Sequence, residues 1–214
     1  EYETYYQTHN LKYMVYQEGV YVGYRYYKAR YEDYVLGGSS VSGSVGSSDG
    51  GEWDYSEEVA FPFGYGLSYA TFEYSDAEFS DDEYDVTVSV TVTNTSDAYS
   101  GKDVVQVYMQ RPYTEYDKQH NIEKPAIELV GFAKTALLTP GASETVTLTI
   151  DKEQMRTYDA YGEGTYILER GDYYFAVGNN AHDALNSVIL AKDPGVDKSR
   201  MYNFPSDGEG DAGY

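Results

Sequence analysis

The sequence has no cysteine, and it has only three histidines and one tryptophan among its 214 residues. The absence of cysteine excludes disulfide bonds, thiolate catalysis and cysteine metal sites, although it does not identify the cellular compartment. The histidines, His9, His120 and His182, are far apart in the sequence and lack the i, i+4 partner of a zinc-binding helix. The sequence therefore predicts no bound metal and no cofactor.

Basic residues are also scarce, since 15 lysines and arginines stand against 36 acidic residues and the formal net charge is −21. Such a surface repels the phosphates of nucleic acids and the headgroups of anionic lipids, whereas neutral sugars are not disfavoured. No apolar run approaches the roughly 18 to 20 residues that span a bilayer. We therefore expect neither a nucleic acid partner nor a membrane partner.

Targeting and catalytic motifs are missing as well. Residues 1–10 lack the basic start and apolar middle of a signal peptide, and the chain begins without methionine, so we expect a processed protein or a fragment. The motifs GxSxG, GxGxxG and the phosphate loop are absent. Because acidic residues are so numerous, position alone cannot select a pair of glycosidase carboxylates, and no catalytic residue is assigned.

Aromatic residues are abundant by contrast, with 27 tyrosines, and they gather in the stretch FPFGYGLSYATF at residues 61–72. A solvated linker is rich in glycine and serine and poor in rings, so this stretch indicates a sharp bend packed against apolar surface. We interpret residues 61–71 as a structural joint between two units, while a tight turn inside one β domain stays open. The residues of this joint are Phe61, Pro62, Phe63, Gly64, Tyr65, Gly66 and Tyr69.

The residues before the joint predict strands and a loop. Residues 13–16 and 20–27 are rich in β-branched and aromatic side chains, which is typical of strands. Residues 37–51 consist almost entirely of Gly, Ser, Val and Asp and predict a flexible exposed loop. Trp53 follows this loop, either as a platform on which a sugar stacks or as an anchor that fastens the end of the loop.

After the joint the hydrophobic period becomes two. Val86, Val88, Val90 and Val92 alternate with threonine and serine, as in a strand with one polar face. Further strands are expected at 71–74, 104–110, 127–135, 145–150, 164–169 and 173–177, the last two as a hairpin, with one helical turn within 152–158. Seven short strands at this spacing predict a mainly β fold, a two-sheet sandwich over residues 72–185. Residues 186–214 are expected to be an acidic tail or linker.

Six blocks of the sequence carry a family resemblance. In order along residues 13–185 they read YQEGVYVGYRYY, FPFGYGLSYATFEYS, VTVTNTSDAYSGKDVVQVYM, KPAIELVGF, LLTPGASETVTLTI and ERGDYYFAVGNNAHD. Together they resemble the C-terminal part of glycoside hydrolase family 3, the family of β-glucosidases and β-xylosidases. The resemblance is greatest to members from anaerobic gut bacteria, which leaves a cytoplasmic or an extracellular location in a bacterium open.

The resemblance implies an architecture. Enzymes of this family have a barrel with the aspartate nucleophile, an α/β sandwich domain that usually supplies the acid/base, and a fibronectin type III-like domain. Residues 1–60 resemble the end of the α/β sandwich, a partial α/β segment with its long loop, and residues 72–185 resemble a seven-stranded immunoglobulin or fibronectin type III-like β-sandwich. The nucleophile motif has no counterpart here, and the barrel lies on either side of this portion.

A function follows from this resemblance. The chain is expected to be a non-catalytic structural portion of a retaining family 3 β-glycosidase. Its expected partners are the remaining barrel and α/β domains, in the same precursor or a separate chain, and a β-glucoside-type saccharide. The loops at 37–53 and 111–125 are expected near the rim of the active site, which makes Trp53, Tyr116 and His120 substrate-rim candidates. A free-standing carbohydrate-binding or adhesive β-sandwich module is the alternative.

Overall fold

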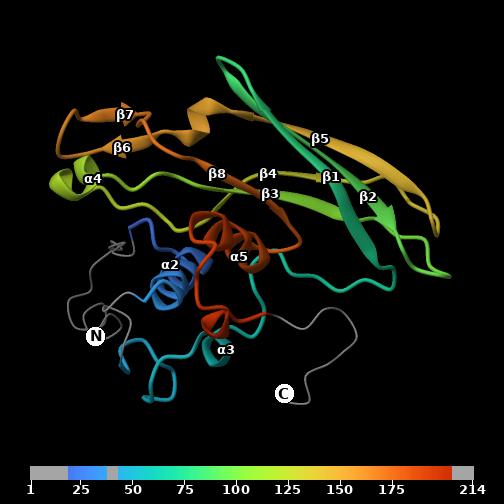
Figure 1. The fold of residues 1–214 in the computed structure, drawn as a ribbon, viewed down its shortest axis with the longest axis horizontal. Coiled ribbons are helices and arrows are strands. Elements are labelled where there is room, and N and C mark those ends of the chain that lie inside the picture. The colour runs from blue at the N-terminus through green and yellow to red at the C-terminus, as the bar shows by residue number, and fades with distance from the viewer. Residues whose placement is uncertain (1–18, 38–42, 204–214) are drawn as a thin grey trace, which may run out of the picture.

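The computed structural model describes residues 19–37 and 43–203, and within these ranges the protein is strand-rich with helices along one side (Figure 1). The helices are α2 (Tyr24–Val35), α3 (Tyr55–Glu58), α4 (Glu115–His120) and α5 (Ala181–Lys192), with 3-10 turns η2 (Lys152–Met155) and η3 (Lys198–Arg200). The strands are β1 (Phe72–Asp81), β2 (Asp85–Asn94), β3 (Val104–Gln110), β4 (Glu128–Lys134), β5 (Ser143–Asp151), β6 (Thr157–Asp159), β7 (Thr165–Ile167) and β8 (Tyr174–Gly178).

Six of these strands form two antiparallel sheets of three, in the orders β1-β2-β5 and β4-β3-β8, and β6 pairs with β7 in a separate ribbon. The alternation predicted for β2 is confirmed, because its valines are buried and its threonines are partly exposed. Val88 and Val90 of β2 share one hydrophobic cluster with Val107 and Met109 of β3 and Ile150 of β5. The inward faces of the two sheets therefore make the first core of the protein.

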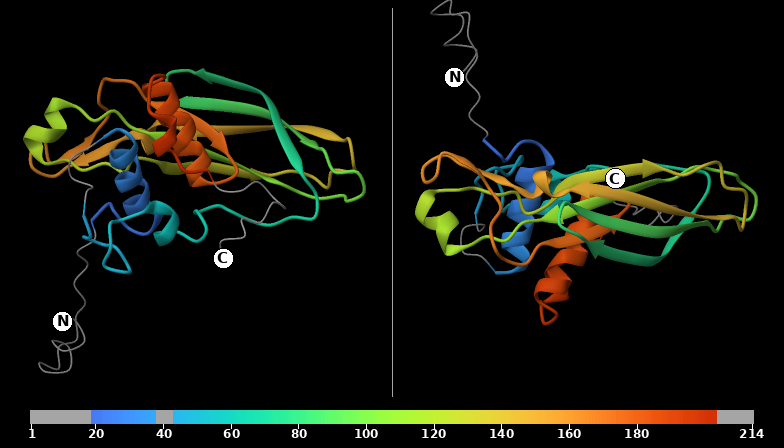
Figure 2. Two further views of the ribbon diagram at one scale, coloured as in Figure 1. Left: turned by 60° about the horizontal axis from the view of Figure 1, so that its bottom comes forward. Right: turned by 90° about the horizontal axis from the view of Figure 1, so that it is seen from above.

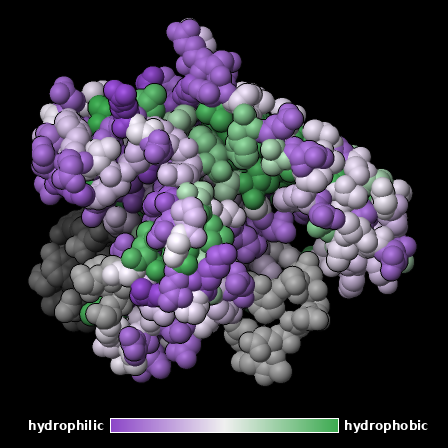
Figure 3. Space-filling model, in the orientation of Figure 1, coloured by the Kyte–Doolittle hydropathy of each residue, from purple (hydrophilic) through white to green (hydrophobic). Residues whose placement is uncertain are grey.

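Helices α2 and α5 make the second core with the other face of the β4-β3-β8 sheet, and they lie along one side of the strands (Figure 2). Tyr108 of β3 and Ala176 of β8 share this cluster with Tyr31 of α2 and Leu185 and Ile189 of α5. Strand β3 is buried on both faces for this reason. Figure 3 shows hydrophobic patches over these helices and the central strands, while the ends of the molecule are mostly hydrophilic.

The strand predicted at residues 20–27 is wrong, because helix α2 begins at Tyr24. Tyrosines favour strands only weakly, and the local signal is overruled by the period of the buried side chains. Lys28, Tyr31 and Val35 are buried at helical spacing on the face that meets α5. The other predicted strand of this region, residues 13–16, lies outside the described residues. Among the described residues before the joint there are helices and no strand.

The hairpin predicted from residues 164–169 and 173–177 is also wrong. Strand β7 pairs with β6 through Tyr166 and Tyr158, whereas β8 pairs with β3. The turn between β6 and β7 contains Gly164 at φ +64°, a conformation that glycine adopts without strain. The residues between β7 and β8 therefore connect two sheets rather than turn within one.

The boundary expected at residue 185 falls inside helix α5, so residues 186–192 are not a tail. Asn180 caps this helix, because its side-chain oxygen accepts hydrogen bonds from the backbone N–H groups of His182 and Asp183. Val188 and Ile189 are buried against the β4-β3-β8 sheet. Within the expected loop at 37–51, residues 43–51 are almost all exposed. None of the described helices combines the length and apolarity needed to cross a bilayer.

We predict that Val88→Ala lowers the free energy of unfolding by about 1.5–3 kcal/mol, because it removes two methyl groups from the core between the sheets. Thr149→Ala, on the exposed face of β5, is the control and should lower it by less than about 1 kcal/mol. Urea denaturation of both variants measures the difference. Equal losses in the two variants would contradict a core between these sheets.

Candidate functional site

The predicted joint at residues 61–71 is not buried within this chain. Phe61 is 70% exposed and Tyr69 is 90% exposed, and Phe63 is also exposed, although Pro62 is buried. The expectation that the rings are buried against apolar surface is therefore wrong for Phe61 and Tyr69 in the chain taken alone. The segment runs alongside the strands between α3 and β1 (Figure 1).

The backbone of the joint is nevertheless held firmly. The carbonyl oxygen of Phe63 accepts a hydrogen bond of 2.8 Å from the backbone N–H of Ala181, at the start of α5. The Gln106 side chain of β3 donates to the carbonyl oxygen of Gly64 at 3.0 Å. Gly64 has φ +88°, and a Cβ there would lie 2.1 Å from the Gln106 side chain, so only glycine fits. The joint is anchored to the sheet and to α5 while most of its rings face outward.

Ring pairs lie along the exposed side of the joint, and two of them are stacked. Phe63 stacks on Tyr24 of α2, with ring centroids 4.3 Å apart and planes 11° apart. Phe61 stacks on Tyr65, with centroids 5.3 Å apart. A cavity of about 420 Å³ opens beside these rings, a volume within the range of small-ligand pockets. Its walls come from α2, α3 and the joint: Gly23, Tyr24, Tyr27, Lys28, Tyr55, Glu58, Val59, Ala60, Phe61, Pro62 and Phe63.

Lys28, one wall of this cavity, is only 1% exposed and sits in a polar network between helices. Its Nζ contacts the hydroxyl of Tyr55 and lies 2.8 Å from Nδ1 of His182. The Nε2 of His182 lies 2.7 Å from the carbonyl oxygen of Tyr202. Since a carbonyl oxygen only accepts, Nε2 carries the proton and Nδ1 of the neutral ring accepts from Lys28.

Burial makes the neutral forms of both groups favourable. Desolvation lowers the pKa of Lys28 to about 6, opposed in part by the negative charge of Asp183. Desolvation, together with the neighbouring Lys28, lowers the pKa of His182 to about 3. At neutral pH both groups are therefore uncharged, in agreement with the hydrogen-bond scheme.

Aromatic rings enclose this network. The ring of Tyr55 stacks on His182, with centroids 4.6 Å apart and planes 13° apart, and Tyr31 lies 4.6 Å from the same imidazole. The hydroxyl of Tyr31 donates to Asn186 at 2.9 Å and accepts from the backbone N–H of Tyr202 at 2.8 Å. Residues from α2, α3, α5 and the stretch after η3 are thus tied together at one place.

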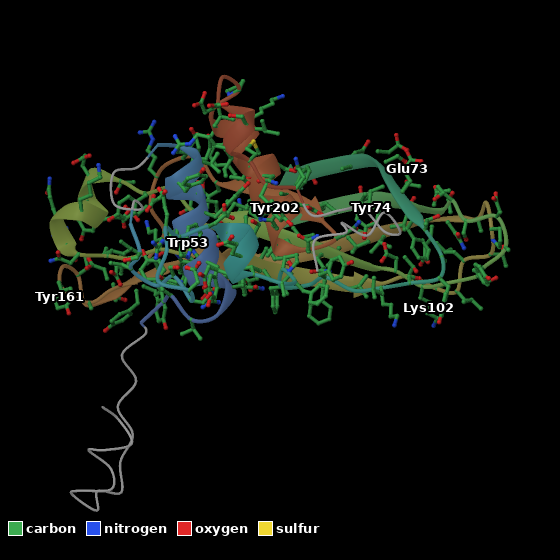
Figure 4. The ribbon with its side chains drawn as sticks, turned by 90° about the horizontal axis from the view of Figure 1, so that it is seen from below. Trp53, Glu73, Tyr74, Lys102, Tyr161 and Tyr202 are labelled. Atoms are coloured by element: carbon green, nitrogen blue, oxygen red, sulfur yellow. The ribbon has the colours of Figure 1, made fainter. Side chains whose placement is uncertain are left out.

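Trp53 is the first substrate-rim candidate, and it is only 3% exposed. The guanidinium of Arg30 lies 4.6 Å from the centre of its ring, and Tyr55 packs against its edge. Figure 4 shows Trp53 beside the helices, in the body of the molecule. Its ring therefore anchors the end of the loop, and within this chain it presents no open face to a sugar.

Tyr116 and His120, the other two candidates, lie together on α4. Their rings stack with centroids 4.0 Å apart, and both are partly exposed. The Tyr116 hydroxyl donates to Asp159 Oδ2 at 2.6 Å, a hydrogen bond that lowers the pKa of Asp159 to about 2 and raises that of Tyr116 to about 12. Tyr161, in the β6–β7 turn, marks this end of the molecule in Figure 4, away from Trp53. The structure therefore brings two of the three candidates together.

Helix α4 is held by a buried ion cluster that the sequence did not reveal. The ammonium of Lys124 contacts Asp117 at 2.8 Å and also contacts Glu169, and the exposed fractions of the three side chains are 4%, 0% and 11% in that order. Thr114 and Asp117 form a capping box at the start of the helix. The pattern Thr-x-x-Asp was the available signal for this helix. The only sequence signal for the burial of Lys28 was its helical spacing, four residues after Tyr24 and three before Tyr31.

In the described part of the chain, no group of three or more acidic or histidine side chains is arranged to hold a metal ion.

Known proteins are similar to this chain in sequence and in fold. Residues 103–181 match the model of the "Fibronectin type III-like domain" family. The chain is 35% identical over 192 residues to "Beta-glucosidase A" of Butyrivibrio fibrisolvens, a match that covers 80% of this chain and 19% of that protein. A β-glucosidase of Kluyveromyces marxianus is 34% identical, over 81% of this chain and 17% of that protein.

Solved structures of β-glucosidases also superpose on this chain. β-Glucosidase 3B of Thermotoga neapolitana superposes with a TM-score of 0.56 at 36% identity, over 78% of this chain and 19% of that one. A β-glucosidase of Paenibacillus barengoltzii superposes with a TM-score of 0.58 at 36% identity, over 78% of this chain and 16% of that one. This chain corresponds to the C-terminal portion of family 3 β-glucosidases.

This family 3 portion spans less than a fifth of the length of the relatives it matches, 19% and 17% for the first two. The fibronectin type III-like match begins just before β3 and ends at the first residue of α5, Ala181. The Lys28 network thus joins α2, which precedes the matched domain, to α5, which follows it.

We predict that this family 3 portion gains stability from its buried amine as pH rises. The unfolded chain binds a proton at Lys28 up to a pKa of about 10.4, whereas the folded chain releases it near 6. Between pH 7 and 9, above the titration of His182, the unfolded state therefore binds more protons and the free energy of unfolding rises. Relative to Lys28→Met, the wild-type value should rise by up to about 1.4 kcal/mol per pH unit.

Urea denaturation at pH 7, 8 and 9 measures this difference, and Lys102→Met, which removes an exposed lysine, is the control. A wild-type value that stays constant or falls relative to Lys28→Met would show that Lys28 is charged in the folded chain.

We also predict that Lys124→Met destabilises the protein by about 3–5 kcal/mol, because it leaves the buried carboxylates of Asp117 and Glu169 without their cation. Lys118→Met is the matched control, since its ion pair with Glu115 is exposed, and it should shift the denaturation midpoint little. Similar shifts in the two variants would contradict a structural role for the buried cluster.

Proposed function

We propose that this chain is a non-catalytic structural portion of a family 3 β-glycosidase, which supports catalytic domains outside it. The observation that carries the proposal is the joint, whose backbone is fixed to β3 and α5 while rings such as Phe61 and Tyr69 are exposed. Exposed aromatic side chains on a fixed backbone are typical of a surface that another domain covers. The chain also spans less than a fifth of its relatives, 19% and 17% for the first two.

The two three-stranded sheets take part in this proposal as the halves of the fibronectin type III-like sandwich. Their facing valines supply its core, and the α2–α5 layer rests on the outer face of one half. The residues before the joint are proposed to be the end of the α/β sandwich domain. The remaining barrel and α/β domains are the partners of this portion.

The reaction of the whole enzyme is proposed to be retaining hydrolysis of β-linked glycosides. Such a reaction requires two carboxyl groups about 5–5.5 Å apart, which domains outside the chain would supply. Relatives with different named substrates share this portion, because an "Exo-alpha-(1->6)-L-arabinopyranosidase" of Bifidobacterium longum is 34% identical to it, much as the β-glucosidases are. Tyr116 and His120 stay proposed rim residues, and Trp53 would act there only by anchoring the loop.

A free-standing carbohydrate-binding module is the second candidate. The observation that favours it is the group of exposed tyrosines around the β6–β7 ribbon, Tyr158, Tyr161 and Tyr166. Rings of this kind can stack on sugar faces. Saturable binding of cello-oligosaccharides by the isolated chain, lost in Tyr161→Ala, would favour this candidate over the first.

We predict that the isolated chain does not hydrolyse an aryl β-glucoside, whereas the native gene product does and has a mass several times larger. Release of the aryl group, followed together with intact mass spectrometry, measures both. Enzyme-like turnover by the chain alone, or a native product of the same length as this chain, would contradict the proposal.

A further inference from the structure

We propose that an acidic side chain from the remainder of the parent enzyme enters the cavity beside the joint and forms an ion pair with Lys28. This inference rests on the proposed function, because it names a contact between this portion and the domains that it supports. The cavity, the buried lysine and the exposed rings at its mouth carry the argument.

A lysine amine is seldom buried without an anionic partner. Lys28 is 1% exposed, yet no salt bridge among the described residues includes it. The other nearly buried lysine of the described chain, Lys124, has two carboxylates in contact. The partners of Lys28 are instead a phenol and a neutral imidazole, which stabilise a neutral amine better than an ammonium ion.

The charged groups around Lys28 do not replace a direct partner. On α5, His182 is neutral, and Asp183 acts on Lys28 only through its field. On α3, Tyr55 is un-ionised, and Glu58 lines the same cavity but accepts a hydrogen bond from the backbone N–H of Ser48. The hydroxyl of Tyr31 on α2 is bound to Asn186, and Tyr202 contributes its carbonyl oxygen to His182.

The cavity supplies the approach for a carboxylate. Lys28 is part of its wall, and an ammonium group has three N–H donors, of which the Tyr55 and His182 contacts use two. The rings of Phe61 and Phe63 at the joint are exposed and suit the apolar stem of a glutamate or the residues around it. The relatives extend far beyond this portion, which covers 19% of the first of them, so a segment that can supply the carboxylate is available.

The arrival of a carboxylate would change the protonation of the site. In the chain alone the amine is neutral at pH 7, since burial lowers the pKa of Lys28 to about 6. An adjacent carboxylate favours the ammonium form and raises the pKa again, so the contact takes up one proton when it forms. The ion pair thus fastens the joint only when the remaining domains are in place.

The test compares Lys28→Met in two proteins at pH 7, this 214-residue chain and the native-length gene product. In the chain, the variant should unfold at the same temperature or a higher one, because it removes a desolvated amine. In the native-length protein, the variant should lower the unfolding temperature of this portion by several degrees, because it leaves a buried carboxylate unpaired. If Lys28→Met does not fold, Lys28→Gln gives the same comparison.

Two control variants complete the test. Lys102→Met, at an exposed lysine, should change neither protein. Glu58→Gln should also change neither, and if it reproduces the effect of Lys28→Met in the native-length protein, the carboxylate belongs to this chain and the inference is wrong. An effect of Lys28→Met with the same sign and size in both proteins overturns it as well. Either result leaves the proposed function standing as long as the native-length product is larger and active.

Discussion

The packing of α2 against α5 around the imidazole of His182 is the constraint on which the rest of the structure depends, and the amine of Lys28 lies 2.8 Å from that imidazole. This contact joins α2, before the fibronectin type III-like domain, to α5, after it, at a separation of 154 residues in sequence. Tyr31 and Tyr55 pack on the same imidazole, and the backbone of Tyr202 closes the network. Because these contacts cross the domain boundary, the helices and the β4-β3-β8 sheet pack as one unit and are not separate units joined by a flexible linker.

That unit gives the joint its shape. Ala181, next to His182, donates to the carbonyl oxygen of Phe63, and Tyr24, one turn before Lys28, stacks on the Phe63 ring. The start of α5 and the ring of Tyr24 therefore fix the backbone and the ring of Phe63 directly. A surface that is rigid and aromatic without its partner loses little conformational entropy when the partner docks. This small entropy loss on docking is expected for a supporting portion of a larger enzyme and not for a flexible connector.

The sequence predicted the β-sheet part well and the helical part poorly. Alternation of valine and threonine in β2 reports burial on one face directly, so that strand followed from the residues alone. Helix α2 was missed because Tyr24, Tyr26 and Tyr27 look like a strand until the positions of Lys28 and Tyr31 are considered. The pairing of β7 with β6 depends on contacts outside the local turn, which a reading of turns and periods does not provide.

The site shows the same division. Stacking of Tyr116 on His120 follows from their i, i+4 spacing once α4 is known, whereas the burial of Trp53 depends on Arg30 and Tyr55, which only the fold brings near. The exposure of the joint could not be predicted because a ring-rich turn has the same sequence whether its cover lies in the same chain or in another part of the protein. Composition reports that a surface is apolar, but not what covers it.

The central claim is that the exposed rings of the joint are covered by the rest of the parent enzyme. Hydroxyl-radical footprinting of Phe61, Phe63 and Tyr69, read by mass spectrometry in this chain and in the native-length protein, tests it most directly. The account predicts rapid oxidation of all three rings in the chain and strong protection of them in the native-length protein, while Tyr161 reacts equally in both. Equal oxidation of the three joint rings in the two proteins would contradict it.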